Sequence, residues 1–142
     1  IRLPVVSAPT VLIIYHDMNR RFQLTTQLAG YGYRVISSDH SDAAVEIMKK
    51  EDVGIVLLDW VEAGMGGGIM IAKIRNDPRW RSIPFVAITG HEVDQSKRDI
   101  LEGFGVPRLV QPWEPESLID LLYDVSVRKK KAERQSKQGE GQ

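Results

Sequence analysis

The stretch "GIVLLDWVEAGMGG", residues 54–67, gives the clearest indication of the fold class, because a run of large apolar residues ends in one acidic residue and a glycine-rich segment follows. The apolar run is too short for a helix and has no polar alternation, which is typical of a strand covered on both faces of a parallel sheet. We therefore predict a buried strand over residues 53–59, with Asp59 at its end. A flexible turn over residues 64–68 and a helix over residues 67–78 are expected to follow.

The same order of strand and helix recurs along the chain. Apolar runs predict the other strands, at residues 10–17, 33–38, 83–90 and 106–112. Helical spacing predicts the other helices, at residues 18–30, 41–50, 94–105 and 115–134. Alternating strands and helices joined by short connections predict an α/β fold, a doubly wound five-stranded parallel sheet with helices on both faces.

Local signals refine three of these helices. In the first helix, apolar residues at helical spacing predict one buried stripe, formed by Phe22, Leu24, Leu28 and Ala29. Ser41 is the expected N-cap of the second helix. Pro115 occupies the first turn of the last helix, which is a favoured position for proline.

Composition indicates one domain. The chain has 142 residues, of which 42% are hydrophobic, and it contains no cysteine. A disulfide framework, a thiolate zinc site and a cysteine nucleophile are therefore excluded. The apolar runs are much shorter than the roughly 20 residues that cross a bilayer, so we expect a cytoplasmic protein. The predicted organisation is an N-terminal extension over residues 1–9, a globular domain over residues 10–126, and a basic helical extension or linker over residues 127–142.

The charges are unevenly distributed, although 19 basic and 19 acidic residues give a formal net charge of zero. Residues 128–142 are basic, and the preceding part of the chain is mildly acidic. This pattern argues against a nucleic-acid-binding face on the globular part. No membrane partner is expected, because the apolar runs are short. A DNA-binding regulator that uses the basic tail is left as one alternative.

The residues that end the predicted strands form the expected site, because ligands bind outside the carboxyl ends of parallel strands. They are Tyr15, His16, Asp17, Asp59, Thr89, Gly90, Gln111, Pro112 and Trp113. Trp60 and Trp113 flank this site, where they serve either recognition or the edge of the core.

Four segments, "VLIIYHDMNRR", "IVLLDWVEAGMGG", "IPFVAITG" and "LVQPW", occur in an order and spacing that resembles the receiver domain of two-component response regulators. The resemblance covers about residues 10–125 and implies a flavodoxin-like fold. It implies that Asp59 is the phosphoacceptor, which takes a phosphoryl group from a histidine kinase or a phosphotransfer protein. Thr89 matches the hydroxyl that bonds the phosphoryl group, and Gly90 matches the small residue beside it.

Other positions depart from the family pattern. The two carboxylates that usually hold magnesium are Tyr15 and His16, and the usual lysine is Gln111. Magnesium prefers carboxylates and water as ligands. The resemblance therefore implies at most a weak magnesium site, formed by Asp59 together with Asp17 if Asp17 turns inward.

Further departures lie in the loop after Asp59 and in the last strand. Met65 and Gly67 match the family loop, whereas Ala63 and Gly66 replace its usual proline and acidic residue. Arg108 stands where many receivers have a switch aromatic, so the usual rotation of a ring is not expected there.

Two functional hypotheses follow. The first is a receiver module that accepts phosphate at Asp59 or signals through protein contacts, with Thr89 and Gln111 completing the site. Its partners would be a histidine kinase or phosphotransfer protein, an output domain, or a second copy in a homodimer. The second is a phosphorylation-independent pseudo-receiver that docks or dimerises through its last helix and strand. Both are signalling modules rather than enzymes.

Alternative sites have weaker signals. The segment "GMGGG" at residues 64–68 lacks the lysine and hydroxyl of a phosphate-binding loop, so no nucleotide cofactor is implied. His16, His40 and His91 match no metal-binding spacing, and only His16 with Asp59 remains a candidate pair for a softer metal such as zinc. Ordinary hydrolase motifs are missing from the sequence.

Overall fold

A computed structural model describes the backbone of residues 9–90 and 95–140, and the side chains of residues 9–60, 68–90 and 95–127. Most of the predicted N-terminal extension and His91 therefore lie outside the described residues. The strands are β1 (Val11–Ile14), β2 (Val35–Ser38), β3 (Ile55–Asp59), β4 (Phe85–Thr89) and β5 (Arg108–Val110). The helices are α1 (Met18–Gly30), α2 (Ala44–Lys50), α3 (Trp60–Asn76), α4 (Gln95–Gly103) and α5 (Pro115–Glu140), with a short 3-10 turn, η1 (Ser41–Ala43), before α2.

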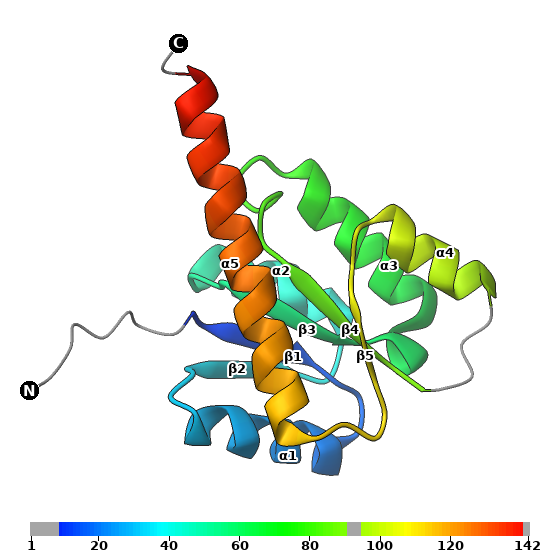
Figure 1. The fold of residues 1–142 in the computed structure, drawn as a ribbon. Coiled ribbons are helices and arrows are strands. Elements are labelled where there is room, and N and C mark those ends of the chain that lie inside the picture. The colour runs from blue at the N-terminus through cyan, green and yellow to red at the C-terminus, as the bar shows by residue number, and fades with distance from the viewer. Residues whose placement is uncertain (1–8, 91–94, 141–142) are drawn as a thin grey trace, which may run out of the picture.

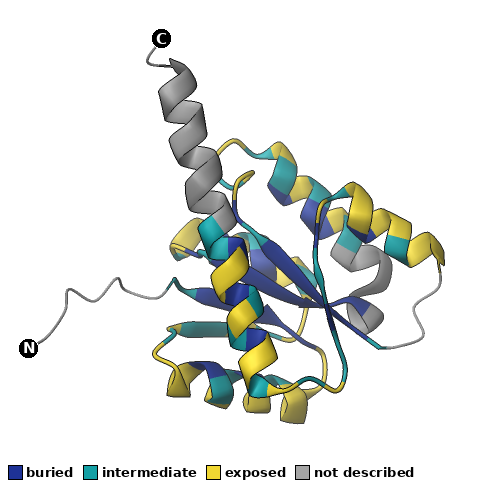
Figure 2. Cartoon of the chain, in the orientation of Figure 1, coloured by how far each residue is buried: buried dark blue, intermediate teal, exposed yellow. Residues whose placement is uncertain are grey.

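The strands form one parallel sheet in the order β2-β1-β3-β4-β5, which confirms the predicted doubly wound fold (Figure 1). In Figure 1, β3 and β4 run toward the lower right, so the carboxyl edge of the sheet lies on that side of the view. Every residue of β1, β3 and β4 is buried (Figure 2), as expected of strands covered on both faces.

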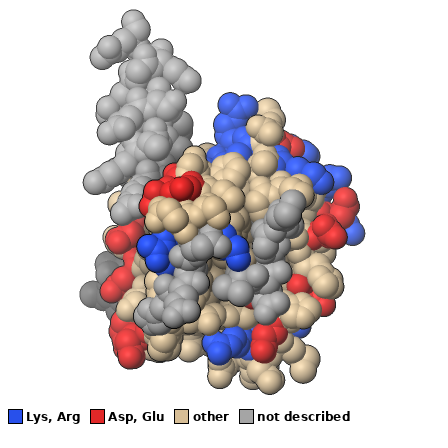
Figure 3. Space-filling view, turned by 90° about the vertical axis from the view of Figure 1, so that its right-hand side faces the viewer, with Lys and Arg blue, Asp and Glu red and all other residues tan. Residues whose placement is uncertain are grey.

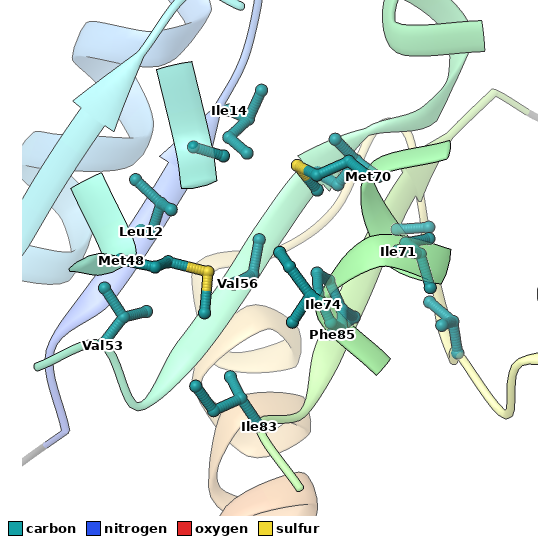
Figure 4. Packing of buried hydrophobic residues seen from close by; sticks show 14 of the residues in the cluster. Leu12, Ile14, Met48, Val53, Val56, Met70, Ile71, Ile74, Ile83 and Phe85 are labelled. Atoms are coloured by element: carbon teal, nitrogen blue, oxygen red, sulfur yellow. The ribbon is translucent and has the colours of Figure 1, made fainter. Parts of the chain in front are cut away.

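Two apolar clusters sandwich the sheet. Leu24 and Leu28 of α1 pack on one face with Leu118 and Leu122 of α5. The other face packs against α2, α3 and α4, where Met48, Met70, Ile71 and Ile74 surround Val56 and Phe85 (Figure 4). Each buried side chain of this size stabilises the fold by roughly 1.5–3 kcal/mol. The sheet is thus held rigidly, and its carboxyl edge is a fixed platform for the site.

Helix α3 corrects the prediction for the glycine-rich segment. Residues 64–68 are helical, and α3 begins at Trp60, directly after Asp59. The local glycine content favoured a turn, but Trp60 is only 3% exposed and packs in the core with residues from later turns of the same helix. A Cβ built at Gly68 would lie 3.8 Å from Cη2 of Trp60, so the indole lies along the helix. Tertiary packing overrides glycine propensity here.

Two further expectations were wrong. Ser41 is not an N-cap, because it lies inside η1. The N-cap of η1 is His40, whose side chain makes no capping hydrogen bond. Phe22 is 71% exposed and Ala29 is also exposed, because only Leu24 and Leu28 of the predicted stripe reach the sheet.

The last helix continues through the basic segment as far as Glu140. Among the described residues, no helix is both long enough and apolar enough to cross a membrane.

Candidate functional site at the carboxyl edge of the sheet

The predicted site residues meet at one edge of the sheet. Tyr15 follows β1, Asp59 ends β3, Thr89 ends β4 and Gln111 follows β5. Side chains alternate between the faces of a strand. Asp59 follows Leu57 by two positions, and Leu57 packs on the face covered by α1 and α5, as Tyr15 does.

Thr89 approaches the edge from the opposite face. It follows Ala87 by two positions, and Ala87 belongs to the cluster under α2, α3 and α4. Asp59 pairs with Ile88 across the β3–β4 ladder, so Thr89 is the next residue along the neighbouring strand. Asp59 is 2% exposed and Thr89 is fully buried. The structure therefore brings the two residues to adjoining strand ends and removes both from water.

A hydrogen bond connects the residues that follow β1 and β5 across this edge. The Nε2 amide of Gln111 donates to the hydroxyl of Tyr15. The parent strands β1 and β5 are separated by β3 and β4. Three strand spacings amount to about 14 Å, so these two side chains together span the end of the sheet.

Tyr15 lies close enough to Asp59 for the charge of the carboxylate to act on the Tyr15 phenol. Burial raises the pKa of the Tyr15 phenol, and the negative charge of Asp59 raises it further, while Arg20 and the bond from Gln111 oppose the increase. Tyr15 is 3% exposed. It therefore stays neutral and protonated at the position where the family pattern has a carboxylate.

Arg108 contacts Thr89, the other site residue that matches the family pattern. Its Nε donates to the Thr89 hydroxyl at 3.2 Å. The two strands are also tied by the backbone, since the Gln111 amide donates to the Thr89 carbonyl at 2.8 Å. The sequence marked Arg108 only as a missing aromatic, and nothing in the sequence pattern indicated this bond.

Asp17 has a local structural role. Its Oδ1 accepts hydrogen bonds from the backbone amides of Asn19 at 2.8 Å and Arg20 at 3.1 Å, so it is the N-cap of α1. The side chain is exposed, whereas Asp59 is buried. The structure thus differs from the expectation that Asp17 turns inward to pair with Asp59.

Arg21 fixes the same turn. Its Nη1 donates to the carbonyl oxygens of Tyr15 at 2.6 Å and His16 at 3.3 Å. These bonds connect α1 to the end of β1 and hold the backbone that positions the Tyr15 ring. Arg20 and Arg21 were not among the predicted site residues, because arginines in the first turns of a helix carry no distinctive sequence signal.

The residues that the structure describes at this edge do not fit a magnesium site. Magnesium requires carboxylate oxygens and near-octahedral geometry. The side chains after β1 are a buried phenol and an exposed imidazole, and Asp17 is engaged in capping. Within the described parts of the chain, no group of three histidine, aspartate or glutamate residues is placed to hold a metal ion.

His16 and Asp59, the candidate pair for zinc, differ in exposure to solvent. His16 is exposed, and its ring centroid lies 6.2 Å from that of His40, whose Nε2 is 3.7 Å from Oδ2 of Asp39. Asp59 is buried on the sheet. His16 therefore groups with His40 rather than with Asp59.

Trp60 and Trp113, the tryptophans expected to flank the site, both pack with the core clusters. Trp60, the first residue of α3, is buried in the core, and its indole nitrogen has no hydrogen-bond partner among the described residues. Trp113 is half-buried and its Nε1 donates to Oε1 of Gln27 in α1 at 3.5 Å. This contact connects the start of α5 to α1 beside the site.

Comparisons with known proteins agree with this architecture. Residues 11–123 match the family model described as the response regulator receiver domain. The chain is 28% identical over 116 residues to the response regulator protein FleR of Pseudomonas aeruginosa, covering 81% of this chain and 24% of FleR. It is 22% identical over 113 residues to the phosphate regulon transcriptional regulatory protein PhoB of the same species, covering 80% of this chain and 49% of PhoB. The chain thus spans half or less of the length of these relatives.

The fold has close structural counterparts. A crystal structure of a putative response regulator from Chloroflexus aurantiacus aligns with a TM-score of 0.76 at 22% identity, covering 84% of this chain and 98% of that one. The match to the family model extends over most of the globular part, from β1 into α5. The chain therefore belongs to the response regulator receiver domains, which are signalling modules of two-component systems.

Proposed function

We propose that this receiver domain signals through protein contacts and does not undergo magnesium-dependent phosphorylation at Asp59. The observation that carries the proposal is the hydrogen bond between Tyr15 and Gln111, which crosses the end of the sheet where the family pattern has a carboxylate and a lysine. Under this proposal, the domain is a pseudo-receiver with the fold of the family and a closed acceptor site.

The first reason to expect no phosphorylation of Asp59 is the lack of charge on the side chains beside it. Phosphoryl transfer relies on positioning and on cations that neutralise the transferring group. Tyr15 and Gln111 are both neutral, and replacing a charged donor with a neutral one typically forfeits roughly 1.5–3 kcal/mol per contact to an anion. Tyr15 and His16 also replace the two carboxylates with which the family holds magnesium, so the two sources of positive charge usual in this family are weakened beside Asp59.

The second reason to expect no phosphorylation is that the Asp59 carboxylate is hard for a phosphodonor to reach. Asp59 is only 2% exposed, and the side chain of Tyr15 is buried next to it. An incoming phosphohistidine would have to displace the Tyr15 ring and break its bond to Gln111. The hydroxyl of Thr89 is likewise engaged by Arg108.

A phosphate-accepting receiver remains the second candidate, supported by Asp59 and Thr89 at adjoining strand ends. Under either proposal, the partners would be a histidine kinase or phosphotransfer protein, an output domain, or a second copy of the chain. We also propose a cytoplasmic location, as usual for partners of this class.

Beryllofluoride, which mimics a phosphoryl group on a carboxylate, separates the two candidates. It should be added to the full chain with millimolar magnesium while tryptophan fluorescence is followed. We expect no saturable response from the natural chain. A response that disappears in Asp59→Asn would overturn the proposal and support phosphate acceptance.

A gain-of-function variant provides the positive control. Tyr15→Asp combined with His16→Asp and Gln111→Lys rebuilds the carboxylates and the lysine of the family pattern. This variant is expected to gain a magnesium-dependent response, and adding Asp59→Asn to it should remove that response. If the rebuilt site remains silent while the protein is folded, the closed Tyr15–Gln111 pair is not what prevents the reaction.

A further inference from the structure

Two histidines meet at the carboxyl edge of the sheet, outside the acceptor site. His16 follows β1 and His40 follows β2, and these neighbouring strands end with Ile14 opposite Ser38. The pairing continues past the strands, because the Tyr15 amide donates to the Ser38 carbonyl at 3.0 Å. Carried on by two residues, the same register places His16 opposite His40. The two are 24 positions apart, so sequence spacing could not indicate the pair.

The two imidazole rings are close enough to share one metal ion. Their centroids lie 6.2 Å apart, and their planes are tilted by 49°. With a nitrogen–metal distance of about 2.1 Å and a ring radius of about 1.1 Å, two imidazoles on one ion have centroids at most about 6.4 Å apart. The observed separation is within this limit, so side-chain rotations alone can bring both rings onto one ion.

Hydrogen bonds hold the backbone beneath both rings. Nη1 of Arg21 donates to the His16 carbonyl at 3.3 Å. Oγ of Ser38 donates to the His40 carbonyl at 3.0 Å and accepts from the His40 amide at 3.2 Å. The pair is thus carried by a fixed scaffold, and little of the chain has to be ordered when a ligand binds.

The ring nitrogens are available to a ligand. Both side chains are exposed, and neither imidazole makes a hydrogen bond to the part of the chain that the structure describes. Oδ2 of Asp39 lies 3.7 Å from Nε2 of His40, which is too far for a hydrogen bond. This carboxylate therefore adds negative charge beside the pair and leaves the ring nitrogen unoccupied.

We propose that His16 and His40 bind one divalent transition-metal ion, such as Cu²⁺, Ni²⁺ or Zn²⁺, with water in the remaining positions. Imidazole nitrogens suit these ions, whereas magnesium takes oxygen ligands. The site differs from the magnesium site of the family pattern in its ligands and in its place on the sheet. Its protein ligands are two side chains, which agrees with the finding that no three-residue group among the described residues is placed to hold a metal.

The surroundings of the pair carry charges of both signs. Figure 3 shows the molecule from the side on which the carboxyl edge lies, and both acidic and basic side chains appear in its lower part. Close to His16 in the sequence, Asp17 is followed by Arg20 and Arg21. A mixed surface of this kind does not attract a large polyanion or polycation. The pair is therefore assigned a small ligand that is recognised by its coordination chemistry.

A bound ion would connect the ends of β1 and β2. His16 directly follows Tyr15, so the ion would also tether the turn that carries the Tyr15 ring. Binding to the folded chain should stabilise it by mass action. The inference does not depend on the proposed function, because Asp59 takes no part in it. Failure of metal binding would leave the beryllofluoride result unchanged, and the reverse also holds.

Isothermal titration calorimetry of the full chain, prepared without a histidine tag, tests the site with each ion alone. We expect one ion per chain, with Cu²⁺ bound most tightly of the three. An excess of Mg²⁺ should not displace it. His16→Gln and His40→Gln should each weaken Cu²⁺ binding at least tenfold, because losing even an outer-sphere partner costs about 10–100-fold. His91→Gln, which changes the remaining histidine of the chain, is the matched control and should bind as the natural chain does.

Electron paramagnetic resonance of the Cu²⁺ complex identifies the ligands. We expect coupling to two imidazole nitrogens in the natural chain and to fewer in each of the two site variants. Urea unfolding verifies that every variant is folded. The proposal would be overturned if none of the three ions bound one-to-one, or if His16→Gln and His40→Gln bound Cu²⁺ like the natural chain. Loss of binding in His91→Gln would overturn it as well.

Discussion

Replacing Tyr15 with phenylalanine removes the hydroxyl that accepts the hydrogen bond from Gln111 and keeps the buried ring. A neutral hydrogen bond contributes roughly 0.5–1.5 kcal/mol to stability. Gln111 is only half-buried, so its amide can be hydrated once the partner is lost. We therefore expect a loss of about 1 kcal/mol in the free energy of unfolding, or a fall of about 3 °C in Tm for a chain of this length.

The loss should depend on pH in a defined direction. The pKa of Tyr15 is raised above its ordinary value of 10.0, first by burial and then by the charge of Asp59. Because the folded protein holds the phenolic proton more tightly than the unfolded chain, this contribution is complete below pH 10 and is lost as the pH rises through the folded pKa. The deficit of Tyr15→Phe relative to the natural chain should therefore be full near neutral pH and shrink at more alkaline pH.

Urea unfolding followed by tryptophan fluorescence measures both effects. Tyr33→Phe is the matched control, because Tyr33 is half-buried and its hydroxyl makes no hydrogen bond within the described structure. The pair itself is isolated by a double-mutant cycle with Gln111→Ala. A coupling energy between the two positions that is indistinguishable from zero would refute the bond across the sheet end, and with it the reason given for the closed site.

Three other substitutions probe the remaining contacts. Arg108→Ala leaves the fully buried Thr89 hydroxyl without its donor and should destabilise the fold by about 1–3 kcal/mol, whereas adding Thr89→Val should recover part of that loss, as measured in urea. Asp17→Ala removes the N-cap of α1 and should cost about 0.5–2 kcal/mol, while Asp17→Asn should retain most of the stability; equal losses would contradict a capping role. Gly68→Ala should raise stability by up to about 1 kcal/mol, because the added Cβ makes an ordinary contact with Trp60; destabilisation would contradict the helical assignment of this segment.

The sheet was predictable from the sequence because burial on both faces leaves a clear signal. Runs such as residues 55–58 are continuously apolar, and the structure buries every one of these residues. Asp59 and Thr89 were predictable for the same reason, since a polar residue after such a run must lie at a strand end. Helix α3 was less predictable, because its start depends on how Trp60 packs in the core and not on the local glycines.

The contacts of the site were not predictable. Tyr15 and Gln111 are 96 positions apart, and their bond depends on the strand order and on the face that each side chain takes. The sequence identified both as departures from the family pattern without indicating that they pair. In the same way, helical spacing placed Phe22 on a stripe with Leu24, but only the tilt of α1 on the sheet decides which residues of the stripe are covered.

We propose that Asp59 is closed to phosphorylation, and the intact mass of the chain after incubation with a small-molecule phosphodonor and magnesium checks this. We expect an unchanged mass in the natural chain, and an added phosphoryl group in the variant that carries Tyr15→Asp, His16→Asp and Gln111→Lys. A phosphoryl adduct on the natural chain that is absent from Asp59→Asn would contradict the proposal.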